Sequence, residues 1–269
     1  MSDTIEQFLD QVPVFTLNEF VTHLRKGVKR NVMTMAYNLI KNRRRSGKLG
    51  VVKEGVYYVI KPGTTPASAP VDEYLVASKL APDAMLAFHS ALDTLGFGHS
   101  VFTTYYYFSK VYRRPVRFRG CIYQSVKVPQ SILEAGKELV GSTKVERSGI
   151  KILITDKERT VVEALEHPEY CGGFEEMYRS LEKMPYVQTE LILKYLNLRG
   201  QKNLFARTGF FFEQHREQFH IEESFLQTLE RHKPAQPLYW DRSRKGGVIK
   251  NRWNLIVPEA VDKRKWEEF

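Results

Sequence analysis

The sequence predicts an α+β fold in two parts: a winged helix-turn-helix over residues 1–63 and a mixed α+β domain over residues 71–269. Two observations predict the first part. Between Arg25 and Lys48 there are nine Lys or Arg residues and no Asp or Glu, and a strand–turn–strand pattern follows directly at residues 50–60. A third observation separates the parts, because residues 61–70 contain three prolines and a glycine, which is the composition of a linker.

Three helices are expected before the hairpin. Residues 4–11 are amphipathic, and Pro13 ends this first helix. Thr16 and Glu19 have the spacing of a capping box, so a second helix begins after Thr16 and closes at Gly27. A third helix is expected over residues 31–45, because apolar residues recur there at helical intervals. These residues are Val32, Ala36, Leu39 and Ile40.

The side of the third helix opposite this apolar stripe is polar and cationic, since successive side chains are about 100° apart. It carries Arg30, Thr34, Tyr37, Asn38, Lys41 and Arg45. Lys53 flanks the predicted Glu54-Gly55 turn of the hairpin. A helix fits the major groove and cations match the phosphate charge, so these seven residues are candidate contacts to double-stranded DNA.

The charge distribution favours the same partner. The formal net charge is +10, and residues 1–63 carry 11 Lys or Arg against 5 Asp or Glu. A concentration of positive charge in under a quarter of the chain is typical of nucleic-acid binding. A basic face that is merely solvated remains the alternative interpretation.

The second part reads as strands followed by helices, which is an α+β arrangement. A short helix is expected over residues 71–80, and another ends at Gly96. Antiparallel strands are expected in residues 101–108, 116–128 and 139–154. Further helices are expected over residues 156–166, 172–184, 189–198, 201–212 and 221–232, with one or two short strands in residues 238–257.

Motifs of known chemistry are missing from the sequence. It contains no H-E-x-x-H, G-x-S-x-G, Walker or G-x-G-x-x-G pattern. The two cysteines, Cys121 and Cys171, stand in unrelated contexts and suit core thiols in a reducing cytosol. There is no apolar run of 18 residues and no apolar signal core. The sequence therefore predicts a cytoplasmic protein that is not an enzyme, has no catalytic residues, cofactor or metal site, and has no membrane partner.

The helix that begins near Asp156 admits two interpretations. Asp156 and Glu163 could be ligands of a metal-dependent nuclease. In the structural interpretation, which we prefer, Thr155 or Asp156 caps the helix and Arg159 pairs with a buried or interdomain carboxylate.

Two other segments have both a functional and a structural interpretation. Residues 105–108, Tyr-Tyr-Tyr-Phe, resemble a base-stacking platform, although strand alternation places only two of the four on each face. The other segment is a second basic cluster interleaved with Trp240 and Trp253, which would contact nucleic acid or form a solvated loop. This cluster consists of Arg242, Arg244, Lys245, Lys250 and Arg252.

With this layout, the chain resembles the AbiEi-type antitoxins of bacterial abortive-infection toxin–antitoxin systems. The resemblance covers most of the chain and is carried by three segments in order: residues 55–63, residues 81–92, and residues 152–165 followed by Pro168 and Gly172-Gly173. The most specific element is the helix with the pattern T-D-x-E-R-T. The third helix departs from the family pattern, because it is longer and more basic than the family's usual short helix.

The resemblance implies a transcriptional regulator with two functions in phage defence. The winged helix would bind an operator with inverted repeats and repress its own operon. The domain over residues 71–269 would counteract a nucleotidyltransferase-like toxin, directly or indirectly. The alternatives are a winged-helix-guided metal-dependent nuclease and a stand-alone transcriptional regulator without a toxin partner.

Overall fold

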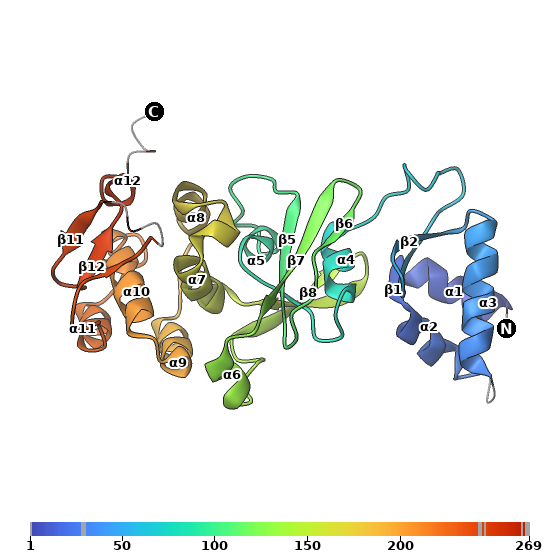
Figure 1. Ribbon diagram of the computed structural model, residues 1–269, viewed down its shortest axis with the longest axis horizontal. Coiled ribbons are helices and arrows are strands. Elements are labelled where there is room, and N and C mark those ends of the chain that lie inside the picture. The colour runs from blue at the N-terminus through green and yellow to red at the C-terminus, as the bar shows by residue number, and fades with distance from the viewer. Residues whose placement is uncertain (1, 28–30, 242–243, 245, 265, 267–269) are drawn as a thin grey trace. The chain divides into compact units, whose positions relative to one another are not determined.

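The computed structural model describes residues 2–27, 31–241, 244, 246–264 and 266, and it has the predicted α+β architecture (Figure 1). The chain forms two compact units whose segments alternate along the sequence. The first unit comprises Met1–Leu86, Phe102–Val126 and Lys144–Leu153. The second comprises Ala87–Val101, Lys127–Thr143 and Ile154–Phe269.

The N-terminal part of the first unit contains three helices and a small antiparallel sheet. The elements are α1 (Ser2–Gln11), β1 (Val14–Thr16), α2 (Leu17–Leu24), α3 (Val32–Arg45), β2 (Leu49–Lys53) and β3 (Val56–Val59). The strands are ordered β1-β3-β2, with Val14 opposite Tyr58 and Leu49 opposite Val59. The helices predicted at residues 4–11 and 31–45 therefore correspond to α1 and α3, and the predicted hairpin is β2–β3.

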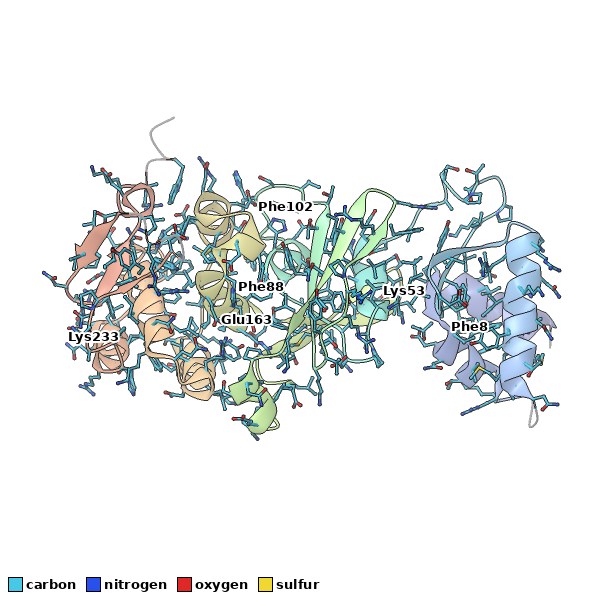
Figure 2. The ribbon with its side chains drawn as sticks, in the orientation of Figure 1. Phe8, Lys53, Phe88, Phe102, Glu163 and Lys233 are labelled. Atoms are coloured by element: carbon cyan, nitrogen blue, oxygen red, sulfur yellow. The ribbon has the colours of Figure 1, made fainter. Side chains whose placement is uncertain are left out.

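Local sequence signals explain how α2 begins and what the N-terminal core contains. The predicted capping box is confirmed: the Glu19 amide donates to Thr16 Oγ1 at 3.1 Å, and the Thr16 amide donates to Glu19 Oε2 at 2.8 Å. An aromatic cluster around Phe8 fills the core between the helices and the sheet (Figure 2). Phe8, Phe15, Phe20 and Tyr57 form this cluster, with ring centroids 5.4–5.9 Å apart in each contacting pair.

Most of a six-stranded sheet also belongs to the first unit. Its order is β6-β7-β5-β4-β9-β8. The strands are β4 (Met85–Leu86), β5 (Thr104–Ser109), β6 (Val116–Phe118), β7 (Cys121–Lys127), β8 (Ser142–Arg147) and β9 (Ile150–Thr155), and the helix α4 spans Glu73–Lys79. These strands fall within the three segments for which strands are expected from the sequence, apart from the short β4 and the last residue of both β5 and β9.

The predicted linker at residues 61–70 consists of turns and irregular backbone, but other residues hold it in place. The Tyr58 hydroxyl donates to the Pro66 carbonyl at 3.0 Å, and Arg119 Nη2 donates to the same oxygen. Arg119 Nη1 also donates to the carbonyl of Ala69, at 2.5 Å, and Ala69 is buried. The linker therefore packs as part of the first unit.

Helices make up most of the second unit. They are α5 (His89–Thr94), α6 (Gln130–Glu134), α7 (Lys157–Glu166), α8 (Phe174–Leu181), α9 (Thr189–Arg199), α10 (Lys202–Gln214), α11 (Glu223–Arg231) and α12 (Glu259–Asp262), with a 3-10 turn, η1, at Pro168–Cys171. A small sheet of order β10-β12-β11 is formed by Leu238–Tyr239, Leu255–Val257 and Val248–Lys250. Among the helices of the described residues, none combines the length and the apolar character needed to cross a bilayer.

Candidate nucleic-acid interface

The exposed face of α3 brings together five of the seven predicted DNA contacts. Thr34, Tyr37, Asn38, Lys41 and Arg45 are all exposed, whereas Val32, Ala36 and Ile40 on the opposite side are buried. At about 100° per residue, the five exposed side chains lie within about 60° of Thr34 around the helix axis. We call them the α3 face. The sixth residue, Arg30, lies outside the described residues.

The positive charge of the α3 face is not neutralised by the nearby carboxylate of Glu6, because Glu6 pairs with an arginine on another side of the helix. Arg43, on the core side of the helix, pairs with Glu6 of α1 at 2.5 Å. Within the described part of the chain, Lys41 and Arg45 have no ion-pair partner. The helix also contains no acidic residue to offset its basic last turn. An exposed cationic surface without internal neutralisation is suited to a polyanion.

Lys53 is not part of this face. It ends β2, as predicted, but its ammonium donates to the Leu80 carbonyl at 3.3 Å, and its side chain is partly buried (Figure 2). Burial lowers the pKa of Lys53, and the charge of Arg113 lowers it further. A lysine in this position contributes less to a phosphate interface than the exposed cations of α3.

Two cations close to the α3 face are missing from the predicted set. Arg44 is exposed next to Arg45, and Arg119 comes from the turn between β6 and β7. The guanidinium of Arg119 lies 4.8 Å from the ring centroid of Tyr58 in β3. Because Arg119 is far from α3 in the sequence, helical periodicity does not indicate that it lies near this helix. The feature of the sequence that points to a cationic surface around Arg119 is the absence of any Asp or Glu from Thr94 to Leu133.

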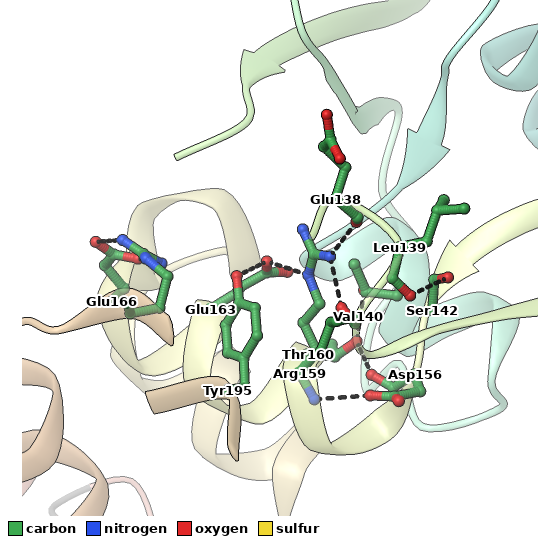
Figure 3. Close-up of polar contacts among 12 residues, drawn as sticks. Glu138, Leu139, Val140, Ser142, Asp156, Arg159, Thr160, Glu163, Glu166 and Tyr195 are labelled. Atoms are coloured by element: carbon green, nitrogen blue, oxygen red, sulfur yellow. Dashed lines mark hydrogen bonds and ion pairs between the residues drawn. The ribbon is translucent and has the colours of Figure 1, made fainter. Parts of the chain in front are cut away.

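The second candidate site, the α7 helix start, is a buried network of hydrogen bonds (Figure 3). Asp156 caps α7 by accepting from the Arg159 amide at 2.8 Å, as the structural interpretation predicts. Arg159 is fully buried and donates through Nε to Glu163 Oε1 at 2.7 Å. Its Nη1 donates to the carbonyls of Glu138 and Val140 at 2.8 and 2.9 Å.

The carboxylate of Glu163 is enclosed by this network. Its Oε1 also accepts from the Tyr195 hydroxyl at 2.7 Å. Burial raises the pKa of Glu163, while Arg159 and the Tyr195 hydroxyl act in the opposite direction. Nowhere in the described ranges do three or more His, Cys, Asp or Glu residues form a group that could hold a metal ion. Glu163 therefore joins α7 to α9, and Arg159 joins this pair to the segment before β8.

The two remaining candidate segments are largely engaged inside the protein. Tyr105, Tyr107 and Phe108 are buried, so three of the four aromatic residues at 105–108 are inaccessible to a base, one more than strand alternation suggests. In the second basic cluster, Arg252 pairs with three carboxylates at 2.5–3.0 Å. Those carboxylates belong to Glu213, Glu223 and Glu230. Lys250 pairs with Asp262, and Arg242 and Lys245 lie outside the described residues.

Comparison with known proteins identifies a shared fold. No protein-family model matches this chain, and no curated protein is similar to it in sequence. A solved structure described as the crystal structure of RV2827C protein from Mycobacterium tuberculosis is similar, with a TM-score of 0.63. The two sequences are 18% identical, and the match covers 99% of this chain and 94% of the other. This similarity extends over both units and concerns their architecture.

Proposed function

We propose that this chain is a DNA-binding antitoxin of the AbiEi type that represses its own operon. In this proposal, residues 1–63 form a winged helix-turn-helix in which α3 is the recognition helix and β2–β3 is the wing. Residues 71–269 counteract a nucleotidyltransferase-like toxin, directly or indirectly. The observation that carries the DNA-binding half is the α3 face, where polar and cationic side chains are exposed and Lys41 and Arg45 have no ion-pair partner within the described residues.

The dimensions of α3 suit this function. A helix of 14 residues is about 21 Å long, and with its side chains it is about as wide as the major groove. The α3 face offers donors of two kinds: Asn38 can form paired hydrogen bonds with a base edge, and Lys41 and Arg45 can bind phosphates. Tyr37 is 48% exposed on the same face and adds an aromatic contact surface.

The antitoxin half rests on the resemblance in the α7 segment. There the T-D-x-E-R-T pattern is used for helix capping and for the buried Arg159–Glu163 pair. This arrangement supports a structural role for the motif and favours an antitoxin over a nuclease, because the proposed metal ligand Glu163 already accepts two hydrogen bonds.

The DNA-binding half is tested by titrating the full-length protein with a duplex from upstream of its own gene at several salt concentrations. Replacing Lys41 and Arg45 with alanine should reduce the slope of log K against log salt by about 1.8, or about 0.9 for each lost phosphate contact. The control removes two exposed cations from the second unit, Lys202→Ala with Arg231→Ala, and should leave the slope unchanged. Equal affinity of the α3 variant and the wild type at ~0.15 M salt would exclude α3 as the recognition helix.

The alternatives are tested separately. Co-expression with the protein encoded by the neighbouring gene should relieve its toxicity, and the α3 variant should keep this effect. Absence of a toxic neighbour would favour a stand-alone regulator. Degradation of DNA or RNA by the purified protein with Mg²⁺ or Mn²⁺, lost in Asp156→Asn, would favour the nuclease.

A further inference from the structure

A hollow of about 530 Å³ lies beside the α3 face. Its walls come from the last turns of α3, from β2 and β3, and from the linker. We call it the α3 hollow; its lining residues include Lys41, Arg44, Arg45, Gly50, Tyr58 and Pro66. Gly50 is required here because a Cβ at this position would lie 2.0 Å from Cζ of the Tyr58 ring. The Tyr58 ring therefore packs directly over the strand backbone.

The hollow is surrounded by positive charge. Lys41, Arg44 and Arg45 are exposed, and within the described residues none of them has a carboxylate partner. Among the residues that the structure describes, no Asp or Glu lines the hollow. Their neighbour Arg43 is neutralised by Glu6. The cations at the end of α3 that keep their charge are therefore the ones that line the hollow.

Arg119 adds a fourth cation from a different sheet, because it lies in the turn between β6 and β7 of the six-stranded sheet. Its guanidinium lies 4.8 Å from the Tyr58 ring centroid and 5.2 Å from that of Phe118, and it donates to the carbonyl of Pro66, which lines the hollow. Carbonyl acceptors do not neutralise a guanidinium, so the charge of Arg119 adds to that of the α3 cations.

The backbone of Arg119 has a conformation that few non-glycine residues adopt. Arg119 and Gly120 form the two-residue turn between β6 and β7, and both have positive φ, 49° and 79°. Such turns favour Asn or Gly at the first position, and a larger residue in this conformation costs free energy of order 1 kcal/mol. Backbone strain of this kind clusters at functional sites, which makes the Arg119 side chain a candidate for a functional contact.

We propose that the α3 hollow is a binding site for a backbone phosphate of the duplex whose major groove α3 enters, with Arg44 as the direct ligand and Arg119 as a second cation at its edge. This inference rests on the proposed DNA-binding function and adds a site to it. Two of the hollow's cations, Lys41 and Arg45, also belong to the α3 face, so a duplex on that face places one of its two phosphate strands beside the hollow. Arginine suits this role because its planar guanidinium can bind phosphate through paired hydrogen bonds.

The test uses two single variants of the full-length protein and the same duplex. Arg44→Gln removes the direct ligand, and Arg119→Asn removes the second cation while keeping a residue that accepts positive φ. Each should reduce the salt slope by about 0.9 and weaken binding about fivefold at ~0.15 M salt, which is the effect of one phosphate contact. The matched control is Arg231→Gln, which removes an exposed arginine at the end of α11 and should leave the slope unchanged. Circular dichroism of each variant verifies that it is folded.

The outcomes separate this inference from the proposed function. Wild-type slopes in both Arg44→Gln and Arg119→Asn, with weakened binding in the Lys41 and Arg45 variant, would overturn the phosphate site and leave α3 as the recognition helix. No binding of the duplex by the wild type would remove the proposed function itself. ATP and inorganic phosphate serve as probes for a free-anion site. Binding of either that is lost in Arg44→Gln, while the DNA slope is unchanged, would show that the hollow takes a free anion and overturn its assignment to DNA.

Discussion

Replacing Arg159 with methionine should destabilise the second unit by about 3–5 kcal/mol, the cost of breaking a buried ion pair from one side. The substitution keeps most of the side-chain volume, so the loss is mainly electrostatic. It leaves the Glu163 carboxylate with the Tyr195 hydroxyl as its remaining hydrogen-bond donor among the described residues. It also removes the donor that Arg159 Nη1 supplies to two carbonyls. An unsatisfied buried polar group costs about 1–3 kcal/mol, so the carboxylate and the carbonyls together reach the expected range.

The loss should depend on pH in a defined direction. Burial already raises the pKa of Glu163, and removal of Arg159 takes away its main opposing charge. In the variant, the folded state then binds a proton at a pH where the unfolded chain is still ionised. Stability of the variant therefore rises as the pH falls toward the ordinary glutamate pKa, by up to about 1.4 kcal/mol per pH unit. The difference in stability from the wild type should shrink as the pH falls toward the ordinary glutamate pKa of about 4.3.

The assay is urea unfolding followed by tryptophan fluorescence. All three tryptophans of the chain, Trp240, Trp253 and Trp266, belong to the second unit, so their signal reports on the unit that contains Arg159. The control is the double variant Arg159→Met with Glu163→Gln, which removes both charges of this buried pair and should be more stable at pH 8 than Arg159→Met alone. A single variant within 1 kcal/mol of the wild type, or one whose deficit grows with acidification, would refute the reasoning.

Three further substitutions have defined outcomes. Thr16→Ala removes the capping box and should cost about 1 kcal/mol, seen as faster amide hydrogen exchange in α2. Gly209→Ala places a Cβ 2.1 Å from the buried Trp253 ring and should cost about 1–3 kcal/mol, with a shifted fluorescence maximum. Glu176→Gln tests an acid-sensitive contact: burial opposes ionisation of Glu176, but hydrogen bonds, chiefly from Ser100, outweigh it and hold its pKa below the usual value. The wild type should lose this stabilisation as the pH falls through the Glu176 pKa, and the variant should lack that part of the acid dependence.

Each of these expectations has a result that contradicts it. Unchanged exchange in the Thr16 variant would mean that tertiary packing alone holds the start of α2. A Gly209 variant as stable as the wild type would mean that the Trp253 ring can move. An acid titration of the Glu176 variant identical to that of the wild type would place the acid-sensitive group elsewhere.

Local features of the fold were predictable because their causes lie within a few residues. The capping box at Thr16 and the cap at Asp156 depend on side chains three positions apart, and the buried stripe of α3 follows from helical periodicity. For Arg159 the sequence predicts a buried or interdomain carboxylate as the partner, and the structure identifies the buried Glu163.

Features that depend on distant segments were not predictable in the same way. The position of the Lys53 ammonium is set by the Leu80 carbonyl, and that of Arg119 by Tyr58 and the linker. The composition of residues 61–70 indicates a linker but contains no information on the residues that hold it. The sequence of the basic cluster at residues 242–252 does not distinguish a nucleic-acid surface from a solvated loop, because the three glutamates around Arg252 come from two other helices.

The alternation of the two units along the chain has a consequence for biosynthesis. The polypeptide passes from one unit to the other five times between residues 86 and 154. On the ribosome, the first unit lacks its last strands until residue 153 has emerged, and parts of the second unit must wait for residues from 154 onward. A nascent chain stopped anywhere in this interval exposes strands and helices without their partners. Early termination or a single cleavage there would therefore yield fragments for degradation, and a stable shortened protein would be the exception.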